Sequence, residues 1–151
     1  MTKIDRNGYS SRIDYKIFCQ MLNATEMPKY TLLWTLLYYT RARISAALSL
    51  RRCDCYVDCL PRESIVFRSA NLKRSGGIQQ PSLEVPIALP LKTYLQAYWG
   101  QFKWEDSEWL FEGIDKYVHL SRSAADKHFR IIMKRIRKDR HGYSIHGFKR
   151  N

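Results

Sequence analysis

The spacing of apolar side chains predicts a mostly helical chain. The first apolar positions recur at helical intervals and indicate a short amphipathic helix that ends before Pro28: Ile13, Ile17, Phe18 and Met21. Residues Tyr30–Tyr39 are apolar on nearly every side, so we expect a buried central helix there. Another helix is expected over Ser45–Leu50, where the apolar face continues.

A β-hairpin is predicted in the middle of the chain. Ser64–Arg68 and Leu83–Leu89 are β-branched and apolar, and the glycine pair that follows Arg74 signals a turn between them. We expect an antiparallel pair that presents Lys73 and Arg74 near its tip. Pro86 is typical of an edge strand, because proline cannot donate to a ladder.

Helical spacing returns in the second half of the chain. Leu91–Phe102 carries apolar residues on one side, and Trp109-Leu110-Phe111 forms a short apolar anchor. Ser121 or Ser123 is placed to cap a helix that runs to about Lys138. The last segment, residues 144–151, begins like a helix. The pattern predicts an α+β fold, mainly α with a small antiparallel β-sheet.

Composition fits one intracellular domain. The chain has 151 residues, 45% of them apolar, and a core of that size needs no disulfide or metal for stability. Cys53, Cys55 and Cys59 lack the paired spacing of a zinc site, so we interpret the cysteines as packing residues and one or two exposed thiols. No stretch approaches the roughly 20 apolar residues of a membrane span, and the N-terminus lacks a secretory core. We expect a cytoplasmic protein with no cofactor and no membrane partner.

The charge is strongly positive and unevenly placed. The net charge is +12, and residues 127–151 hold nine Lys and Arg against one acid, Asp139. One face of the helix after Ser123 carries much of this excess: Lys127, Arg130, Lys134, Arg135 and Arg137. Such a run is either a solvated helix face or a surface for phosphates, since counterion release favours clustered cations on a polyanion. Nucleic acid is the leading expected partner, ahead of an anionic membrane surface.

Three cations remote from one another in the chain have the chemistry of a phosphodiester site. Arg43 lies between two apolar helical segments, so we expect its guanidinium to be partly buried and to need an anionic partner. Lys73 lies on the hairpin and His146 near the end of the chain. A guanidinium holds two phosphate oxygens, while a lysine and a histidine protonate a leaving oxygen or contact the third. His119, His128 and His141 are expected to face solvent or cap helices.

The stretch LLYYTRARISAALSLRRCDC, residues 36–55, resembles the first motif of the catalytic domain of tyrosine recombinases, the phage-integrase type. The resemblance places Arg43 on the first catalytic arginine and Asp54 on the aspartate that closes the motif. The hairpin matches a family hairpin that carries a catalytic lysine, with Lys73 as the first choice and Arg74 as the alternative. The resemblance as a whole implies a recombinase-type domain over residues 30–151, preceded by a helical extension or linker over 1–29.

The end of the sequence resembles a second family motif, HxLR. His146 matches its histidine, and Lys149 stands where the second catalytic arginine belongs, with Arg150 adjacent. Lysine supplies a point charge in place of a bidentate fork. In that family a later tyrosine attacks a DNA phosphate without metal, but no tyrosine follows His146 here, and Tyr143 is interpreted as a loop-packing residue.

The resemblance therefore implies a C-terminally truncated, DNA-binding domain of site-specific recombination or integration, from a phage, plasmid or other mobile element. Acting alone, this chain is expected not to cleave DNA. Further backbone contacts are expected from the remaining exposed cations: Arg41, Arg74, Arg130, Lys134, Arg135, Arg137 and Arg150. The alternative is a non-catalytic regulatory protein that reuses the fold. In either case, the partners are double-stranded DNA and either a second copy or a full-length recombinase.

Overall fold

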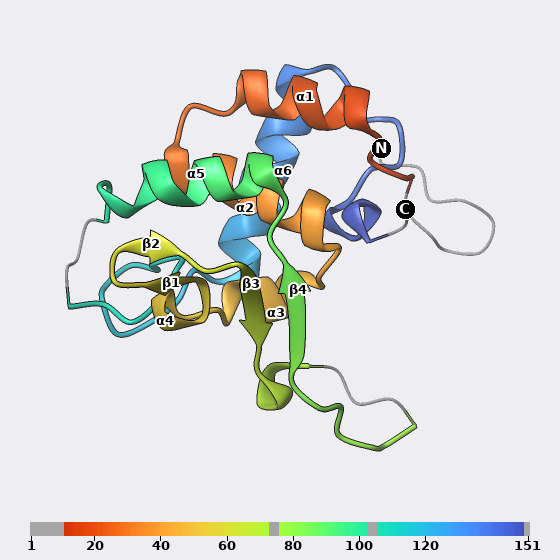
Figure 1. The fold of residues 1–151 in the computed structure, drawn as a ribbon. Helices are drawn as coiled ribbons and strands as arrows, with labels where there is room; N and C mark the ends of the chain where they lie inside the picture. Colours follow the sequence, from red (N-terminus) through yellow and green to blue (C-terminus); the bar gives the residue numbers. More distant parts are fainter. Residues whose placement is uncertain (1–10, 73–75, 103–105, 150–151) are drawn as a thin grey trace.

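The computed structural model describes residues 11–72, 76–102 and 106–149. Helices dominate, and two separate antiparallel sheets of two strands each accompany them (Figure 1). The predicted α+β class is confirmed, with one more sheet than expected. In chain order the elements are α1 (Tyr15–Ala24), α2 (Pro28–Thr40), α3 (Ile44–Leu48), α4 (Arg52–Cys55), β1 (Tyr56–Val57), β2 (Leu60–Pro61), β3 (Ser64–Phe67), the 3₁₀ helix η1 (Ser69–Asn71), β4 (Leu83–Pro86), α5 (Leu89–Trp99), α6 (Arg122–Arg135) and the 3₁₀ helix η2 (Ile145–Phe148).

Helix α2 is the buried centre of the fold, as its all-round apolar sequence predicts. Every residue from Leu32 through Leu37 is buried, and Pro28 occupies the start of the helix, where a missing N–H is tolerated. Helices α1, α3 and α5 each pack against α2. The helix ends at Thr40, and the left-handed backbone of the following Arg41 (φ 57°) turns the chain toward α3.

The N-terminal segment belongs to the same core as the rest of the chain. The four apolar positions predicted for the first helix are buried in and just before α1: Ile13, Ile17, Phe18 and Met21. Backbone bonds join this segment to the chain's end, since Ser11 N–H donates to the Gly142 carbonyl and Ile13 N–H to the Gly147 carbonyl. Residues on both sides of the predicted boundary at residue 30 therefore share one apolar interior.

The predicted hairpin is formed by β3 and β4. Ser64 pairs with Pro86 and Phe67 with Leu83, in antiparallel register. Ile65 and Phe67 are buried, so one face of β3 packs on the helices, whereas the hairpin projects away from them toward its tip (Figure 1). Lys73 and Arg74, expected near that tip, lie outside the described residues.

Helix α6 crosses the molecule from α3 to α1. The Ser121 hydroxyl accepts the Ala124 N–H, so Ser121 rather than Ser123 caps the helix. The predicted inward face is confirmed over the helix itself: Ala125, Phe129, Ile132 and Met133 are buried. The helix stops at Arg135, short of the predicted Lys138, because Arg137 adopts a left-handed backbone (φ 59°) that no helix accommodates.

The cysteines are all free thiols. Cys55 is buried, and Cys53 and Cys59 are exposed, which confirms the interpretation as packing residues and exposed thiols. Across residues 11–72, 76–102 and 106–149, no group of three His, Cys, Asp or Glu is placed to hold a metal ion. No helix in the same ranges is long and apolar enough to cross a membrane.

Candidate nucleic-acid interface

Two of the three predicted site residues line one cavity. Arg43 and His146 lie at this cavity, called the smaller cavity, which has a volume of about 560 Å³. Its lining comes from the start of α3 and the residue before it, from η1 and the residue after it, from the first residue of α6 and from η2: Arg43, Ile44, Ser45, Ala70, Asn71, Leu72, Arg122 and His146. No aspartate or glutamate is among these described lining residues, so its surface is cationic.

Arg43 is exposed, and the prediction that it would be partly buried is wrong. The reason is local: Arg43 is the N-cap of α3, with an extended backbone (φ −68°, ψ 149°), and lies in the short surface loop after Arg41. Its neighbour Ile44 takes the buried position instead. Within the described residues, no carboxylate forms an ion pair with Arg43, so its guanidinium is available to an external anion.

Arg122 is a site residue that the sequence motifs did not reveal. Its Nη2 donates a hydrogen bond to His146 Nε2 at 2.9 Å, which ties the imidazole to the start of α6 beside the cavity. The acid nearest its guanidinium in the described ion pairs is Asp126, at 3.9 Å from Nε. A sequence signal did exist: a cation at the first position of a helix opposes the helix dipole, so arginine is unfavourable there without another role.

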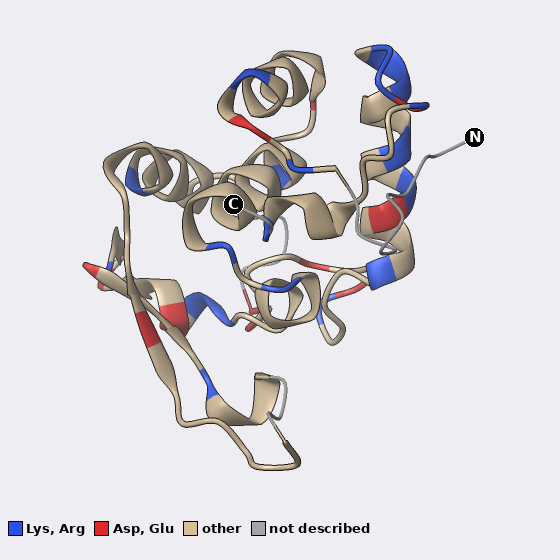
Figure 2. Ribbon diagram, turned by 90° about the vertical axis from the view of Figure 1, so that its right-hand side faces the viewer, with Lys and Arg blue, Asp and Glu red and all other residues tan. Residues whose placement is uncertain are grey.

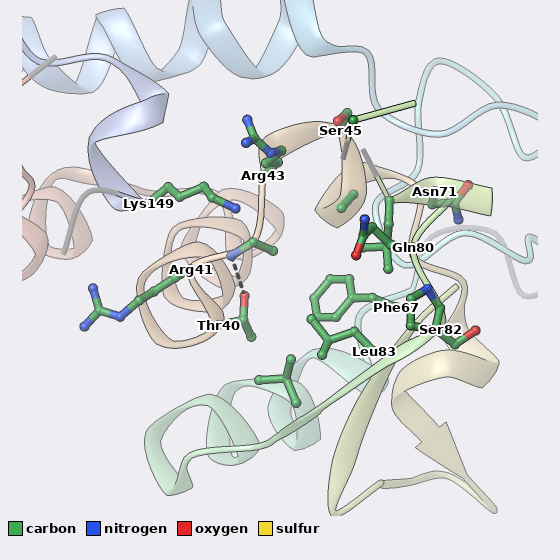
Figure 3. Close-up of a pocket in the computed structure, with 16 residues that line it drawn as sticks. Thr40, Arg41, Arg43, Ser45, Phe67, Asn71, Gln80, Ser82, Leu83 and Lys149 are labelled. Atoms are coloured by element: carbon green, nitrogen blue, oxygen red, sulfur yellow. Dashed lines mark hydrogen bonds between the residues drawn. The ribbon is translucent and has the colours of Figure 1, made fainter. Parts of the chain in front are cut away.

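A larger cavity of about 650 Å³ adjoins the smaller one and shares part of its lining: Arg43, Ser45, Asn71 and Leu72. Figure 3 shows the Lys149 side chain reaching across its cationic end and the Phe67 ring pointing in from the hairpin. Arg41 contributes to the same wall, but its guanidinium points away from the cavity (Figure 3). Arg43, His146 and Lys149 are thus gathered around two adjoining hollows.

The predicted lysine of the hairpin cannot be placed in either cavity. Lys73, its alternative Arg74 and the C-terminal Arg150 all lie outside the described residues. Leu72, which lines both cavities, and Gly76, which lines the larger one, are the described residues that flank Lys73 and Arg74.

The basic face of α6 is a separate surface. The predicted cations are all exposed, and Lys and Arg recur along the helix (Figure 2): Lys127, Arg130, Lys134 and Arg135 lie on α6, and Arg137 follows just after its end. At 1.5 Å per residue the helix carries Arg135 about 20 Å from Arg122. There Arg135 donates to the Ala24 carbonyl at 3.1 Å, so its guanidinium also ties α6 to α1.

The Asp54 carboxylate is buried and holds neighbouring segments of the fold together. It is 3% exposed, accepts the Arg51 N–H and forms an ion pair with Arg68 at 2.9 Å. Arg68 follows β3, so the pair fixes the start of η1 against α4, and η1 in turn lines both cavities. The carboxylate itself lines neither cavity.

His128 does not face solvent, contrary to the sequence prediction. Its ring stacks on Tyr30 with centroids 3.7 Å apart, and Nε2 is buried with no hydrogen-bond partner in the described part of the chain. Burial, followed by the charges of Arg135 and Lys29, lowers the pKa of His128. Tyr143 is half-buried, and burial raises its pKa, as does the nearby Asp14 carboxylate.

No model of a known protein family and no curated protein sequence matches this chain. The functional conclusion therefore depends on the side chains that line the two cavities and on their charge.

Proposed function

We propose that this chain binds the phosphate backbone of double-stranded DNA, as a domain of the tyrosine-recombinase type. The smaller cavity holds one phosphodiester. One observation carries the proposal: three segments far apart in the sequence bring Arg43, Arg122 and His146 to a single hollow whose described lining contains no acid. Three nitrogen-bearing side chains without a carboxylate are a binding site for an anion.

The chemistry favours a phosphodiester over a smaller anion. Arg43 and Arg122 each offer a planar fork that matches two phosphate oxygens. His146 accepts the Arg122 hydrogen bond through Nε2, so its ring positions the second guanidinium at the cavity. Lys149, in the resemblance the counterpart of a second arginine, offers only a point charge. In this proposal Arg122 supplies the second guanidinium.

The rest of the surface supports a long polyanion as the ligand. The net charge is +12, and the basic face of α6 extends about 20 Å from Arg122. Contacts of this kind position a protein on the duplex but carry no base sequence. Arg130, Lys134 and Arg137 are the residues on this face that we assign to flanking phosphates.

A salt titration with point variants tests the proposal. We expect duplex binding at about micromolar Kd to weaken steeply between about 50 and 300 mM salt, because phosphate contacts release counterions. Arg43→Ala and Arg122→Ala are each expected to weaken binding about tenfold and to lower the salt slope by about one. Lys16→Ala, which removes an exposed charge of α1 outside both cavities, is the control.

Binding that is flat across this salt range would contradict the proposal. So would a loss for Lys16→Ala as large as that for Arg43→Ala, because the cavity would then be no different from the general positive surface.

The second candidate is a non-catalytic DNA-binding regulator that uses the same site and competes with a full-length recombinase. Lys149 in place of a guanidinium favours it. A suicide DNA substrate distinguishes the two, since a covalent protein–DNA adduct excludes the regulator. Duplex binding without any adduct fits both candidates, because this chain is expected not to cleave DNA when it acts alone, and competition with a full-length recombinase for its DNA sites then supports the regulator.

A further inference from the structure

The larger cavity has a lining that a DNA backbone alone does not need. One end carries Lys149 and Arg43, as a phosphate requires, but the hairpin side is apolar and includes Phe67, Leu83 and Val85. Its volume of about 650 Å³ lies in the range of small-molecule sites, roughly 300–1,000 Å³. The hollow is therefore large enough for an organic group beside the phosphate.

Polar groups are placed at the edge of this apolar surface. The Gln80 amide and the Phe67 ring both point into the cavity from the hairpin, opposite Lys149 (Figure 3). Asn71 and Ser82 complete this side. Amides both donate and accept hydrogen bonds, so they fit the edge of a flat heterocycle. Phe67 is only 2% exposed, and Leu83, at 51%, supplies most of the apolar contact area.

A flat ring with a hydrogen-bonding edge and an attached anion describes a nucleotide. The two cavities share Arg43, Ser45, Asn71 and Leu72, so a nucleoside joined to a phosphate in the smaller cavity can extend into the larger one. We propose that the larger cavity receives one unpaired nucleotide of the bound DNA. Its base lies against Leu83 and the edge of Phe67, and its ring edge meets Gln80. This inference rests on the proposed function.

The energetics predict a preference for DNA that already contains an unpaired base. Taking a base out of a duplex costs a few kcal/mol, whereas a bulged base has little of that cost. Stacking of a base on an aromatic ring strengthens binding roughly 5- to 150-fold, and contact with Leu83 and the edge of Phe67 is expected at the lower end of that range. A bulge should therefore bind about tenfold more tightly than the paired duplex.

Three DNA probes test the inference: a duplex with one unpaired nucleotide, the same duplex fully paired, and the same bulge with an abasic site. Wild type is expected to bind the bulge about tenfold better than either of the others. The variant Leu83→Ser with Gln80→Ala should show no preference among its own three affinities. Leu89→Ser changes a 75% exposed leucine that does not line the cavity, and it should keep the preference.

The outcomes separate this inference from the proposed function. Equal wild-type affinity for all three probes overturns the nucleotide pocket and leaves phosphate binding intact. A preference that survives in the folded double variant, as judged by circular dichroism, also overturns it, because the base then lies elsewhere. If wild type binds no duplex at all, the proposed function fails and the inference fails with it.

Discussion

His128 shows how one residue can make stability depend on pH. Its imidazole stacks on the ring of Tyr30, and its buried Nε2 has no hydrogen-bond partner in the described residues. Burial and the neighbouring Arg135 and Lys29 charges lower its pKa, so the folded chain binds this proton less readily than the unfolded chain. The stabilisation is complete above the unfolded pKa of about 6.5 and is lost as the pH falls toward the folded value.

We therefore predict that His128→Phe reduces the loss of stability on acidification. Phenylalanine keeps a ring against Tyr30 but cannot bind a proton. The free energy of unfolding, measured in urea at about pH 7.5 and about pH 5.5, should fall less in this variant than in wild type. The control is His141→Phe, at an exposed histidine, and it should fall as wild type does. Equal falls in His128→Phe and wild type would show that another group controls the acid response.

At the scale of single residues, the sequence predicted that two cations remote in the chain lie together, but not how each of them is exposed. Arg43 and His146 were identified from motifs, and both line the smaller cavity. The exposure of Arg43 was predicted wrongly, because neighbouring apolar helices say nothing about the direction of a loop residue. Arg122 was missed because its partner, His146, is 24 residues away and the hydrogen bond exists only in the folded chain.

At the scale of elements, the 3₁₀ helix η2 couples the N-terminal segment to the site. Ile145, Gly147 and Phe148 face the core, whereas His146 and Lys149 are exposed at the cavities. Gly147 lies against residues 11–13: a Cβ there would collide with the Ser11 carbonyl oxygen and lie 3.1 Å from Ile13 Cγ1. Glycine is required at this position by a backbone contact.

Gly147→Ala is thus predicted to destabilise the chain by about 2 kcal/mol, since the two segments must separate to admit a methyl group. Gly100→Ala is the matched control: its φ of −73° suits alanine, no described atom lies within 4 Å of the added Cβ, and its effect should stay within about 0.5 kcal/mol. Urea unfolding of both variants measures the difference. If the two glycines tolerate alanine equally well, the close approach at Ser11 is refuted.

Elements with a clear period could be predicted from sequence, and short ones could not. Helices α1, α2, α5 and α6 and the β3–β4 hairpin were anticipated from apolar spacing. Helix α4 and the β1–β2 pair were missed, because elements of two to four residues show no period. The β1–β2 turn also lacks glycine: Asp58 and Cys59 adopt positive φ values of 51° and 67° in its place.

The whole molecule places its cations in two regions of different character. The two cavities meet at the start of α3 and the end of η1. The smaller one extends to the start of α6 and to η2, and the larger one to the β3–β4 hairpin and Lys149, while the exposed basic face follows α6 toward α1 (Figures 1 and 2). The first region suits one phosphate held by several groups. The second suits a series of screened contacts with flanking phosphates. The number of Lys and Arg along the sequence predicted the basic face of α6. The cationic lining of the cavities forms only when remote segments of the chain fold together.

The most direct test of a shared phosphate is a double-mutant cycle between Arg43 and Arg122. Free energies of duplex binding are measured at one salt concentration for wild type, Arg43→Ala, Arg122→Ala and the double variant. If both guanidinium groups hold the same phosphodiester, the double variant should lose less than the sum of the single losses, by at least about 0.5 kcal/mol. Losses that add to within about 0.3 kcal/mol, or no loss in either single variant, would contradict a common site.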